Sequence, residues 1–191
     1  MPELVGPVIA VGSLGSAVQP SLTVDELVLR PWALSDAPAL VRAYRDPGIQ
    51  RWHARRLDSL AEAEELIAGW RDTWPGEREC HWAVAELGTG ALLGRMALKQ
   101  VDLVDGDAAL AYWTAPDARG RGVCTRAVGA LTAWAFGAGF HRLHLDHSVG
   151  NPASCRVATK SGFAPEGVRR QAARHADGWH DMHVHSRLAT D

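Results

Sequence analysis

A basic, glycine-bearing turn offers the clearest chemistry in this sequence. The apolar run 108–113 ends shortly before Pro116, and the turn Arg119-Gly120-Arg121-Gly122 follows. Glycines let successive backbone N–H groups point inward and approach an anion closely. A helical pattern begins near Val123, and the start of a helix adds unpaired N–H groups and partial positive charge. The spacing predicts a cradle for a pyrophosphate, with the two arginines as cations beside it.

Three classes of nucleotide carry a pyrophosphate that such a turn could hold. A P-loop requires G-x-x-x-x-G-K-[S/T], and the sequence contains no such string. A dinucleotide fingerprint is closer, because Gly120-x-Gly122 lies between a strand and a helix and Asp146 follows near the ribose-binding position. Thr125, however, occupies the third glycine position, and the turn falls late in the chain. The third class is coenzyme A, which the remaining motifs favour.

Several motifs resemble, in the same order, those of the GNAT superfamily of acyl-CoA N-acyltransferases, especially its RimJ/RimL-like branch of ribosomal-protein N-terminal alanine acetyltransferases. The matching stretches are 27–32 (LVLRPW), 111–113 (AYW), 119–122 (RGRG), 151–154 (NPAS), 160–163 (KSGF), 166–167 (EG) and 179–181 (WHD). Each motif is weak alone, but the ordered set is specific. The resemblance implies direct transfer of an acyl group, most simply acetyl, from acyl-CoA to a primary amine within a ternary complex.

The resemblance also implies which residues bind coenzyme A. Backbone amides of residues 119–125 would hold the pyrophosphate, and the pantetheine arm would extend the splayed strand as an added strand does. A backbone N–H near Trp113 would face the thioester carbonyl. The implied set is Trp113, Thr114, Arg119, Gly120, Arg121, Gly122, Val123, Cys124, Thr125, Asn151 and Ser154. Asn151 is equally suited to cap the helix that starts at Pro152.

Acyl transfer to an amine needs a base for the ammonium and an acid for the departing thiolate. Ser154 is the candidate acid. The base is not evident, because the strand before the cradle reads Ala109-Leu110-Ala111 where many relatives carry glutamate. His147, Asp146 and His81 are the open alternatives. A module that binds coenzyme A for regulation, with little catalysis, is the rival class that this gap supports.

The acceptor is less well specified than the donor. Trp52 and Trp82 are expected to line its pocket, since the early helices form the acceptor side in this family. The acceptor would be a protein N-terminus or a small-molecule amine. Succinyl-CoA is an alternative donor, because arginine and histidine near the cleft could meet a second carboxylate.

The nine histidines invite comparison with a metal site. His141, His144 and His147 form one group along the chain, and His180, His183 and His185 form another. No cysteine or acid–histidine motif has recognised zinc spacing, and acyl transfer requires no metal. We therefore expect none.

Composition narrows the setting of the protein. A net charge of −2 disfavours nucleic-acid binding, and no apolar run is long enough to predict a membrane span. Three cysteines without C-x-x-C spacing are typical of a reducing cytoplasm, the expected location. Residues 1–22 are interpreted as an extension docked on the body or on a partner, which leaves a homodimer open. Residues 23–191 are predicted to form one domain.

Hydrophobic periodicity predicts a mixed α/β sheet built around a single β–α–β unit. The resemblance implies the GNAT fold, a mostly antiparallel sheet with one splayed parallel pair and about four flanking helices. Strands are expected at 27–30, 81–87, 92–101, 108–113 and 142–149, with two more flanking Asp177-Gly178. Helices are expected at 35–44, 59–74, 125–137 and 151–162. Pro47-Gly48 is interpreted as the stop of the first helix.

Overall fold

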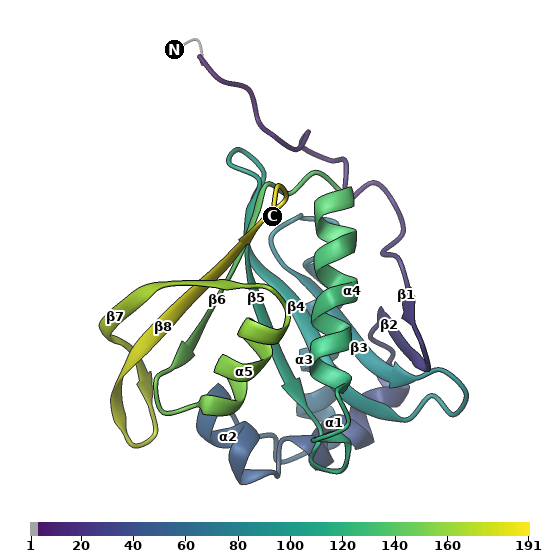
Figure 1. Ribbon diagram of the computed structural model, residues 1–191. Coiled ribbons are helices and arrows are strands. Elements are labelled where there is room, and N and C mark those ends of the chain that lie inside the picture. The colour runs from purple at the N-terminus through teal and green to yellow at the C-terminus, as the bar shows by residue number, and fades with distance from the viewer. Residues whose placement is uncertain (1–3) are drawn as a thin grey trace.

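The computed structural model describes residues 4–191 and contains one eight-stranded sheet flanked by helices (Figure 1). The strands are β1 (Leu22–Val24), β2 (Leu27–Pro31), β3 (Cys80–Glu86), β4 (Leu92–Asp102), β5 (Asp107–Thr114), β6 (Arg142–Ser148), β7 (Ala164–His175) and β8 (Gly178–Leu188). The helices are α1 (Ala37–Ala43), α2 (Pro47–His53), α3 (Leu60–Asp72), α4 (Val123–Gly137) and α5 (Pro152–Lys160). Short 3₁₀ turns occupy Leu34–Asp36 and Pro116–Ala118.

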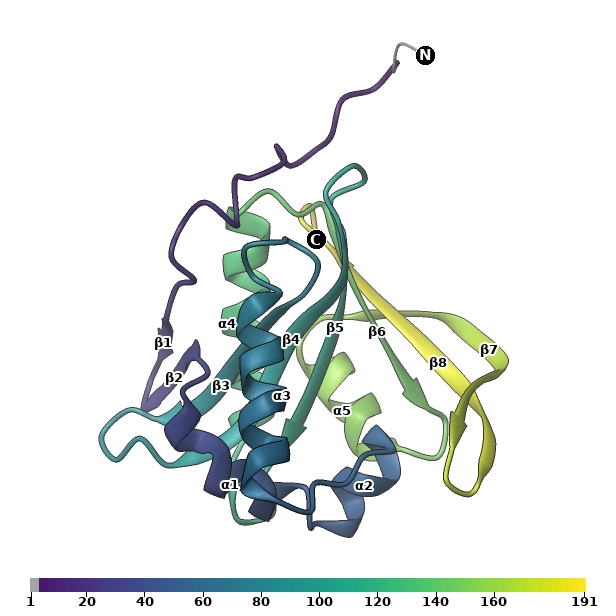
Figure 2. The same ribbon diagram turned by 180° about the vertical axis from the view of Figure 1, so that it is seen from behind.

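The strand order is β1-β2-β3-β4-β5-β6-β8-β7, and every pair except β5–β6 is antiparallel. Helices α4 and α5 cover one face of the sheet, and α1 and α3 cover the other (Figures 1 and 2). A hydrophobic core forms against each face. The predicted fold class is confirmed. Among the described residues no helix is long and apolar enough to cross a membrane.

The parallel pair β5–β6 separates soon after it starts. Only Asp107, Ala108 and Ala109 pair with β6, opposite residues 142–144. Beyond Ala109, β5 stays bonded to β4 and β6 stays bonded to β8, so the side of β5 that faces β6 is open. The predicted splay of this strand pair is therefore confirmed.

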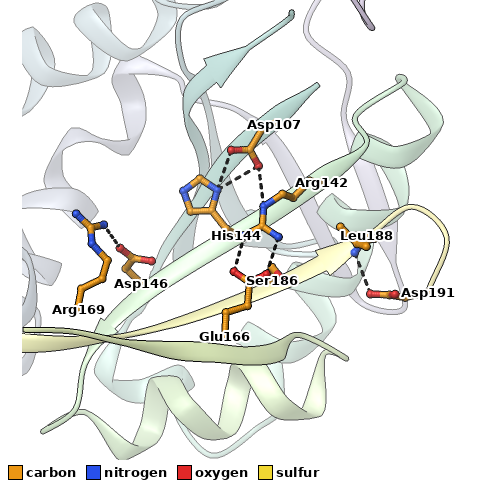
Figure 3. A network of polar contacts seen from close by, with 9 residues as sticks. All are labelled: Asp107, Arg142, His144, Asp146, Glu166, Arg169, Ser186, Leu188 and Asp191. Carbon is orange, nitrogen blue, oxygen red and sulfur yellow. Dashed lines mark hydrogen bonds and ion pairs between the residues drawn. The ribbon is translucent and has the colours of Figure 1, made fainter. Parts of the chain in front are cut away.

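A network of charged side chains fixes the closed end of the divergence (Figure 3). Arg142 on β6 makes two hydrogen bonds to the Glu166 carboxylate, at 2.8 and 2.6 Å, and lies 3.7 Å from Asp107 on β5. Asp107 also contacts His144, and Ser186 on β8 donates to Glu166 at 2.6 Å. Four strands, β5 to β8, thus share one polar lock where β5 and β6 still pair.

Helix α2 was not predicted. Pro47-Gly48 was expected to end the first helix, but it begins a new one. Asp46 is the N-cap and accepts from the N–H of Ile49 at 2.9 Å, while Pro47 takes the first helical position, where no N–H is needed. Residues 44–46 are only a short break between helices, and α2 lies at the end of the sheet where β5 and β6 diverge (Figures 1 and 2).

The N-terminal extension packs along the body of its own chain (Figure 1). Val8 and Ile9 donate backbone hydrogen bonds to residues 103–104, and Ile9 and Leu14 are buried. The buried Glu77 carboxylate accepts three N–H bonds from this segment, at 2.7 to 2.9 Å. The strand β1 that follows, Leu22–Val24, joins the sheet edge.

Candidate active site

The predicted cradle is the start of α4. Gly120 and Gly122 adopt φ of +74° and +73°, a backbone conformation that residues with a Cβ rarely take. Gly122 is the N-cap, and Arg126 makes the first intrahelical bond, to the Gly122 carbonyl. The N–H groups of Val123, Cys124 and Thr125 therefore point out of the helix start without intrahelical acceptors, as anion binding requires.

The two cradle arginines are engaged by acids rather than left as free cations. Arg119 makes a bidentate contact with the Asp46 carboxylate, and Arg121 lies 3.9 Å from Glu86. Burial alone would raise the pKa of Asp46, but Arg119 and the backbone N–H groups of α2 lower it overall. The arginine–aspartate pair therefore ties the cradle to the N-terminus of α2, and backbone amides remain the principal anion donors.

A cleft of about 560 Å³ opens beside the cradle. Its walls come from four places: α2, the open half of β5, the cradle with the start of α4, and α5. All eleven residues expected to bind coenzyme A lie in these elements. Those lining the cleft are Trp113, Thr114, Arg119, Gly120, Gly122, Val123, Cys124, Thr125, Asn151 and Ser154, whereas Arg121 faces Glu86 outside that lining.

A smaller hollow of about 110 Å³ adjoins the cleft in the gap between β5 and β6. Residues on β6, on β8 and at the end of β7 line it, among them Ser148, Met182 and His175. Trp52, expected in the acceptor pocket, lines both the cleft and the hollow. The two spaces therefore form one passage that reaches the gap between the splayed strands.

Trp82 does not lie in this passage, so its assignment to the acceptor pocket is wrong. Its side chain is fully buried under α4, where it packs against Trp74 and Trp134. Its indole N–H donates to the Pro20 carbonyl at 2.8 Å. Strand alternation directs residue 82 to the α4 face of the sheet, whereas α2 supplies the tryptophan beside the gap.

Tyr112 and Ser154 meet where the cleft and the hollow join. The Tyr112 hydroxyl lies 2.7 Å from the Ser154 hydroxyl, and burial raises the pKa of the phenol above its ordinary 10.0. The N–H of Ser154 donates to the Asn151 side chain at 3.1 Å, so Asn151 caps α5 while also lining the cleft. In the sequence, Tyr112 is apparent only as part of the motif 111–113, because its contact with Ser154 depends on the tertiary structure.

His53 also lines both spaces and was missed by the sequence reasoning. Its Nε2 lies 3.1 Å from the Tyr112 carbonyl, which can only accept, so Nε2 carries the proton. Burial, with Arg95 nearby, lowers the pKa of His53 to about 4. A neutral imidazole therefore fixes the backbone of β5 beside the gap. His53 could not be recognised from the sequence because α2, the helix that carries it, was not predicted.

The three expected bases lie in different environments. His81 is buried away from the passage between Glu79 and Arg95, and burial lowers its pKa to about 2. Asp146 borders the hollow but is bound by Arg169 at 2.9 Å (Figure 3). His147 is buried, and its Nε2 faces the His185 ring. Asp146 and His147 both line the hollow, and the buried Asp146 Oδ1 has no hydrogen-bond partner, so these two stay candidate bases, whereas His81 lies outside the passage.

A chain of hydrogen bonds from Ser148 through His180 to Asp177 also reaches the hollow. The Ser148 hydroxyl lies 2.7 Å from His180 Nδ1, and His180 Nε2 lies 2.8 Å from the Asp177 carboxylate. An ionised carboxylate can only accept a hydrogen bond, so Nε2 is the protonated nitrogen and Nδ1 accepts from Ser148. Ser148 lines the hollow, which connects this chain to the passage.

A mostly antiparallel sheet whose parallel pair splays beside a glycine-bearing helix start is the architecture of acyl-CoA-dependent N-acyltransferases. The family model described as an acetyltransferase (GNAT) domain matches residues 26–164. The chain therefore belongs to the GNAT acetyltransferase family, enzymes that transfer an acetyl group from acetyl-CoA to an amine.

Individual relatives agree with this assignment. The chain is 24% identical over 169 residues to the uncharacterized N-acetyltransferase YoaA of Bacillus subtilis, covering 87% of this chain and 96% of that one. It is 28% identical over 98 residues to the ribosomal-protein-serine acetyltransferase of Escherichia coli, covering 51% and 55%. The structure of Mycobacterium smegmatis RimJ in complex with CoA-disulfide has a TM-score of 0.81 at 21% identity, covering 90% and 87%, and shows the common fold.

Proposed function

We propose that the chain transfers an acetyl group from acetyl-CoA to the α-amino group of a protein or peptide N-terminus. The observation that carries the proposal is the continuous passage, in which a donor cleft of about 560 Å³ meets a hollow of about 110 Å³. Both spaces share Trp52, His53, Tyr112, Asn151 and Ser154. Donor and acceptor can thus enter from two sides and meet at one point.

The donor is held mainly by backbone groups. The N–H groups of residues 123–125 receive the pyrophosphate, and the unpaired edge of β5 receives the pantetheine amides as a missing strand would. This arrangement leads the thioester to Tyr112 and Ser154, the pair at the junction of the two spaces. A backbone N–H near Trp113 stabilises the oxyanion of the tetrahedral intermediate.

The acceptor amine loses its proton through Ser148. The ammonium donates to the Ser148 hydroxyl oxygen as that hydroxyl gives its own proton to His180 Nδ1, and Asp177 stabilises the resulting imidazolium. The neutral amine then attacks the thioester carbon, and the C–S bond breaks as the thiolate takes a proton from the Tyr112–Ser154 pair. The nitrogen's second proton restores that pair, and His180 releases the first proton to solvent.

A peptide N-terminus suits the shape and setting of the hollow. Its small volume suits the amine end of a peptide, and Trp52 and His175, whose rings pack edge to face, form part of its wall. The name of the Escherichia coli relative, a ribosomal-protein-serine acetyltransferase, supports the same acceptor class.

Thiol release from acetyl-CoA in the presence of peptides tests the proposal. Peptides with a free N-terminal serine or alanine should give free thiol and a product with the acetyl group on the α-nitrogen, located by tandem mass spectrometry. The same peptides with a blocked N-terminus should give none. Exclusive acetylation of lysine or of small amines would overturn the acceptor, and preference for succinyl-CoA would overturn the donor. Binding of coenzyme A without thiol release for any amine would overturn catalysis itself.

A further inference from the structure

Four side chains that can bind a metal converge beneath α5, apart from the cradle. They are His147 on β6, His183 and His185 on β8, and Cys155 on α5, and their ligand atoms all lie within 4.8 Å of one another. His147 pairs directly with His183 across the two strands, and His185 stands two residues along β8, so the three imidazoles share one face. Helix α5 packs over that face and supplies the thiol.

The tautomers of the two buried imidazoles are fixed by backbone carbonyls. His147 Nδ1 lies 2.9 Å from the Ser148 carbonyl, and His185 Nδ1 lies 3.4 Å from the Phe163 carbonyl. A carbonyl can only accept, so each Nδ1 carries the hydrogen and each Nε2 carries a lone pair. A histidine that binds a metal is commonly oriented by this kind of outer hydrogen bond.

The two Nε2 lone pairs face each other. His147 Nε2 and His185 Nε2 are 3.3 Å apart, and the two side chains are 5% and 3% exposed. Two buried acceptors at this distance repel unless a cation lies between them.

We propose that His147, His183, His185 and Cys155 form a tetrahedral zinc site. Two imidazole nitrogens that bind one zinc at about 2.0–2.1 Å in tetrahedral geometry lie about 3.3–3.4 Å apart, which matches the His147–His185 separation. Small side-chain rotations bring the other ligand atoms from within 4.8 Å to this spacing. On binding, the Cys155 thiol loses its proton to solvent and the three imidazoles bind as neutral ligands.

The site is structural rather than catalytic, because four protein ligands leave no open coordination position. Cys155 directly follows Ser154, so the metal would fasten the first turn of α5 to β6 and β8. Acetyl transfer itself would still proceed without metal chemistry. The groups of histidines apparent in the sequence do not match this set, because strand pairing joins His147 to His183 across the sheet.

Metal content and cobalt spectroscopy of the full-length protein test the proposal. After removal of metal with a chelator, the protein should bind about one Zn²⁺ per chain, and its melting temperature should rise. Co²⁺ should give the strong visible bands of a tetrahedral site and a thiolate-to-cobalt charge-transfer band. Cys155→Ser should abolish the charge-transfer band, and His183→Gln should weaken Zn²⁺ binding about tenfold or more.

Matched variants separate this site from other thiols and imidazoles. Cys124→Ser removes a thiol beside the cleft, and His144→Gln removes a β6 histidine on the opposite face; both should keep the metal. Circular dichroism of each metal-free variant checks that it is folded. Absence of stoichiometric metal, an octahedral cobalt spectrum, or a charge-transfer band that survives Cys155→Ser would overturn the proposal, as would a shared proton detected at His147 in place of metal. These readouts do not depend on acetyl transfer.

Discussion

Ser148 and His180 stand at the entrance of the proposed proton path. Ser148 is buried and accepts from the N–H of Gly150 at 3.1 Å while it contacts His180, so its hydroxyl has a fixed direction. Asp177 on the β7–β8 turn holds His180 from the far side. A proton can therefore leave the hollow along a defined line of hydrogen bonds.

His180→Gln should lower kcat by about 100-fold or more, because it removes a general base, while the KM for acetyl-CoA stays unchanged. In the variant, the rate should rise with pH up to the pKa of the peptide α-amino group, about 7.7–8.0. Steady-state kinetics across pH measures both effects. Trp179→Phe, at the exposed neighbouring position, is the control. Equal loss in both variants would contradict the relay.

Tyr112→Phe should also slow turnover, since the thiolate then loses one of its two proton donors. Because burial raises the pKa of the Tyr112 phenol above 10.0, the sign is that the acid remains protonated in alkaline solution. The wild-type kcat should therefore show no acid-loss limb below pH 10. If the wild-type kcat falls with rising pH already below pH 10, and this fall is absent in Tyr112→Phe, then the phenol ionises below pH 10 and the prediction is wrong.

At the scale of secondary-structure elements, the cradle and the polar lock have separate structural roles. The cradle needs two residues with positive φ directly before α4, because its amides must turn inward before the helix starts. The lock among β5, β6, β7 and β8 keeps the closed end of the divergence in register (Figure 3). The cradle is the proposed binding site of the donor, and the lock holds the closed end of the gap beside it.

Gly122→Ala should weaken coenzyme A binding by about five- to thirtyfold, because forcing a Cβ into the left-handed region costs about 1–2 kcal/mol. Calorimetric titration with coenzyme A measures the loss. Gly129→Ala lies inside α4 with open space around its Cβ position, so it should stabilise the fold by about 0.5–1 kcal/mol and leave binding intact. Unchanged affinity in Gly122→Ala would argue against the cradle.

Glu166→Gln tests the lock. Hydrogen bonds from Arg142 and then Ser186 lower the pKa of Glu166 to about 2. A lowered carboxyl pKa adds stability above its ordinary value of 4.5, and that stability disappears as the pH falls toward 2. Because the carboxylate is 40% exposed and screened by solvent, we expect Glu166→Gln to lower the free energy of unfolding by only about 0.5–1 kcal/mol at pH 7.

Denaturant unfolding at pH 7 and again at acidic pH measures this difference. The difference in free energy of unfolding between wild type and Glu166→Gln should shrink steadily below pH 4.5. Glu64→Gln, on the exposed face of α3, should show no difference at either pH. A constant gap between wild type and Glu166→Gln over the whole range would contradict an origin in the ionised carboxylate.

At the scale of the whole molecule, the N-terminal extension is bound through one buried acid. Burial alone would raise the pKa of Glu77, but the N–H groups of Gly15, Gly12 and Leu14 overcome that effect and lower it. Trp74 adds a hydrogen bond from its indole to the Ala17 carbonyl at 2.8 Å. The extension is thus part of the folded body rather than a separate tail.

Glu77→Gln should release the extension, because a neutral amide cannot replace a carboxylate that accepts three N–H bonds. We expect the free energy of unfolding to fall by about 1–3 kcal/mol at pH 7, and residues 4–20 to be cleaved rapidly by proteases. The contribution from Glu77 should fall as the pH drops below 4.5. Glu79→Gln, two residues away, is the control for proteolysis. Equal protection of wild type and Glu77→Gln would refute this anchor.

The sequence alone determined the donor side of this protein. The glycines at 120 and 122, the helix start at 123 and the cap at Asn151 act through local backbone geometry, which neighbouring residues specify. Strand alternation indicated most strands of the sheet, whereas the splay of the parallel pair followed from the family resemblance. Helix α2 was not predicted, because Pro47 serves equally to stop one helix and to start another, and the short edge strand β1 was not predicted either.

Tertiary structure decided the acceptor side. Ser148 at the end of β6 meets His180 on β8, 32 residues further along the chain. Trp82 lies on β3 in the core, whereas Trp52 lies on α2 beside the gap. Contacts of this kind depend on strand register and helix packing, which join residues far apart in the chain. The same applies to His147 and His183, opposite one another on β6 and β8. Local chemistry therefore indicates the cradle, whereas the residues of the proposed base, the hollow and the proposed zinc site come together only once the sheet has formed.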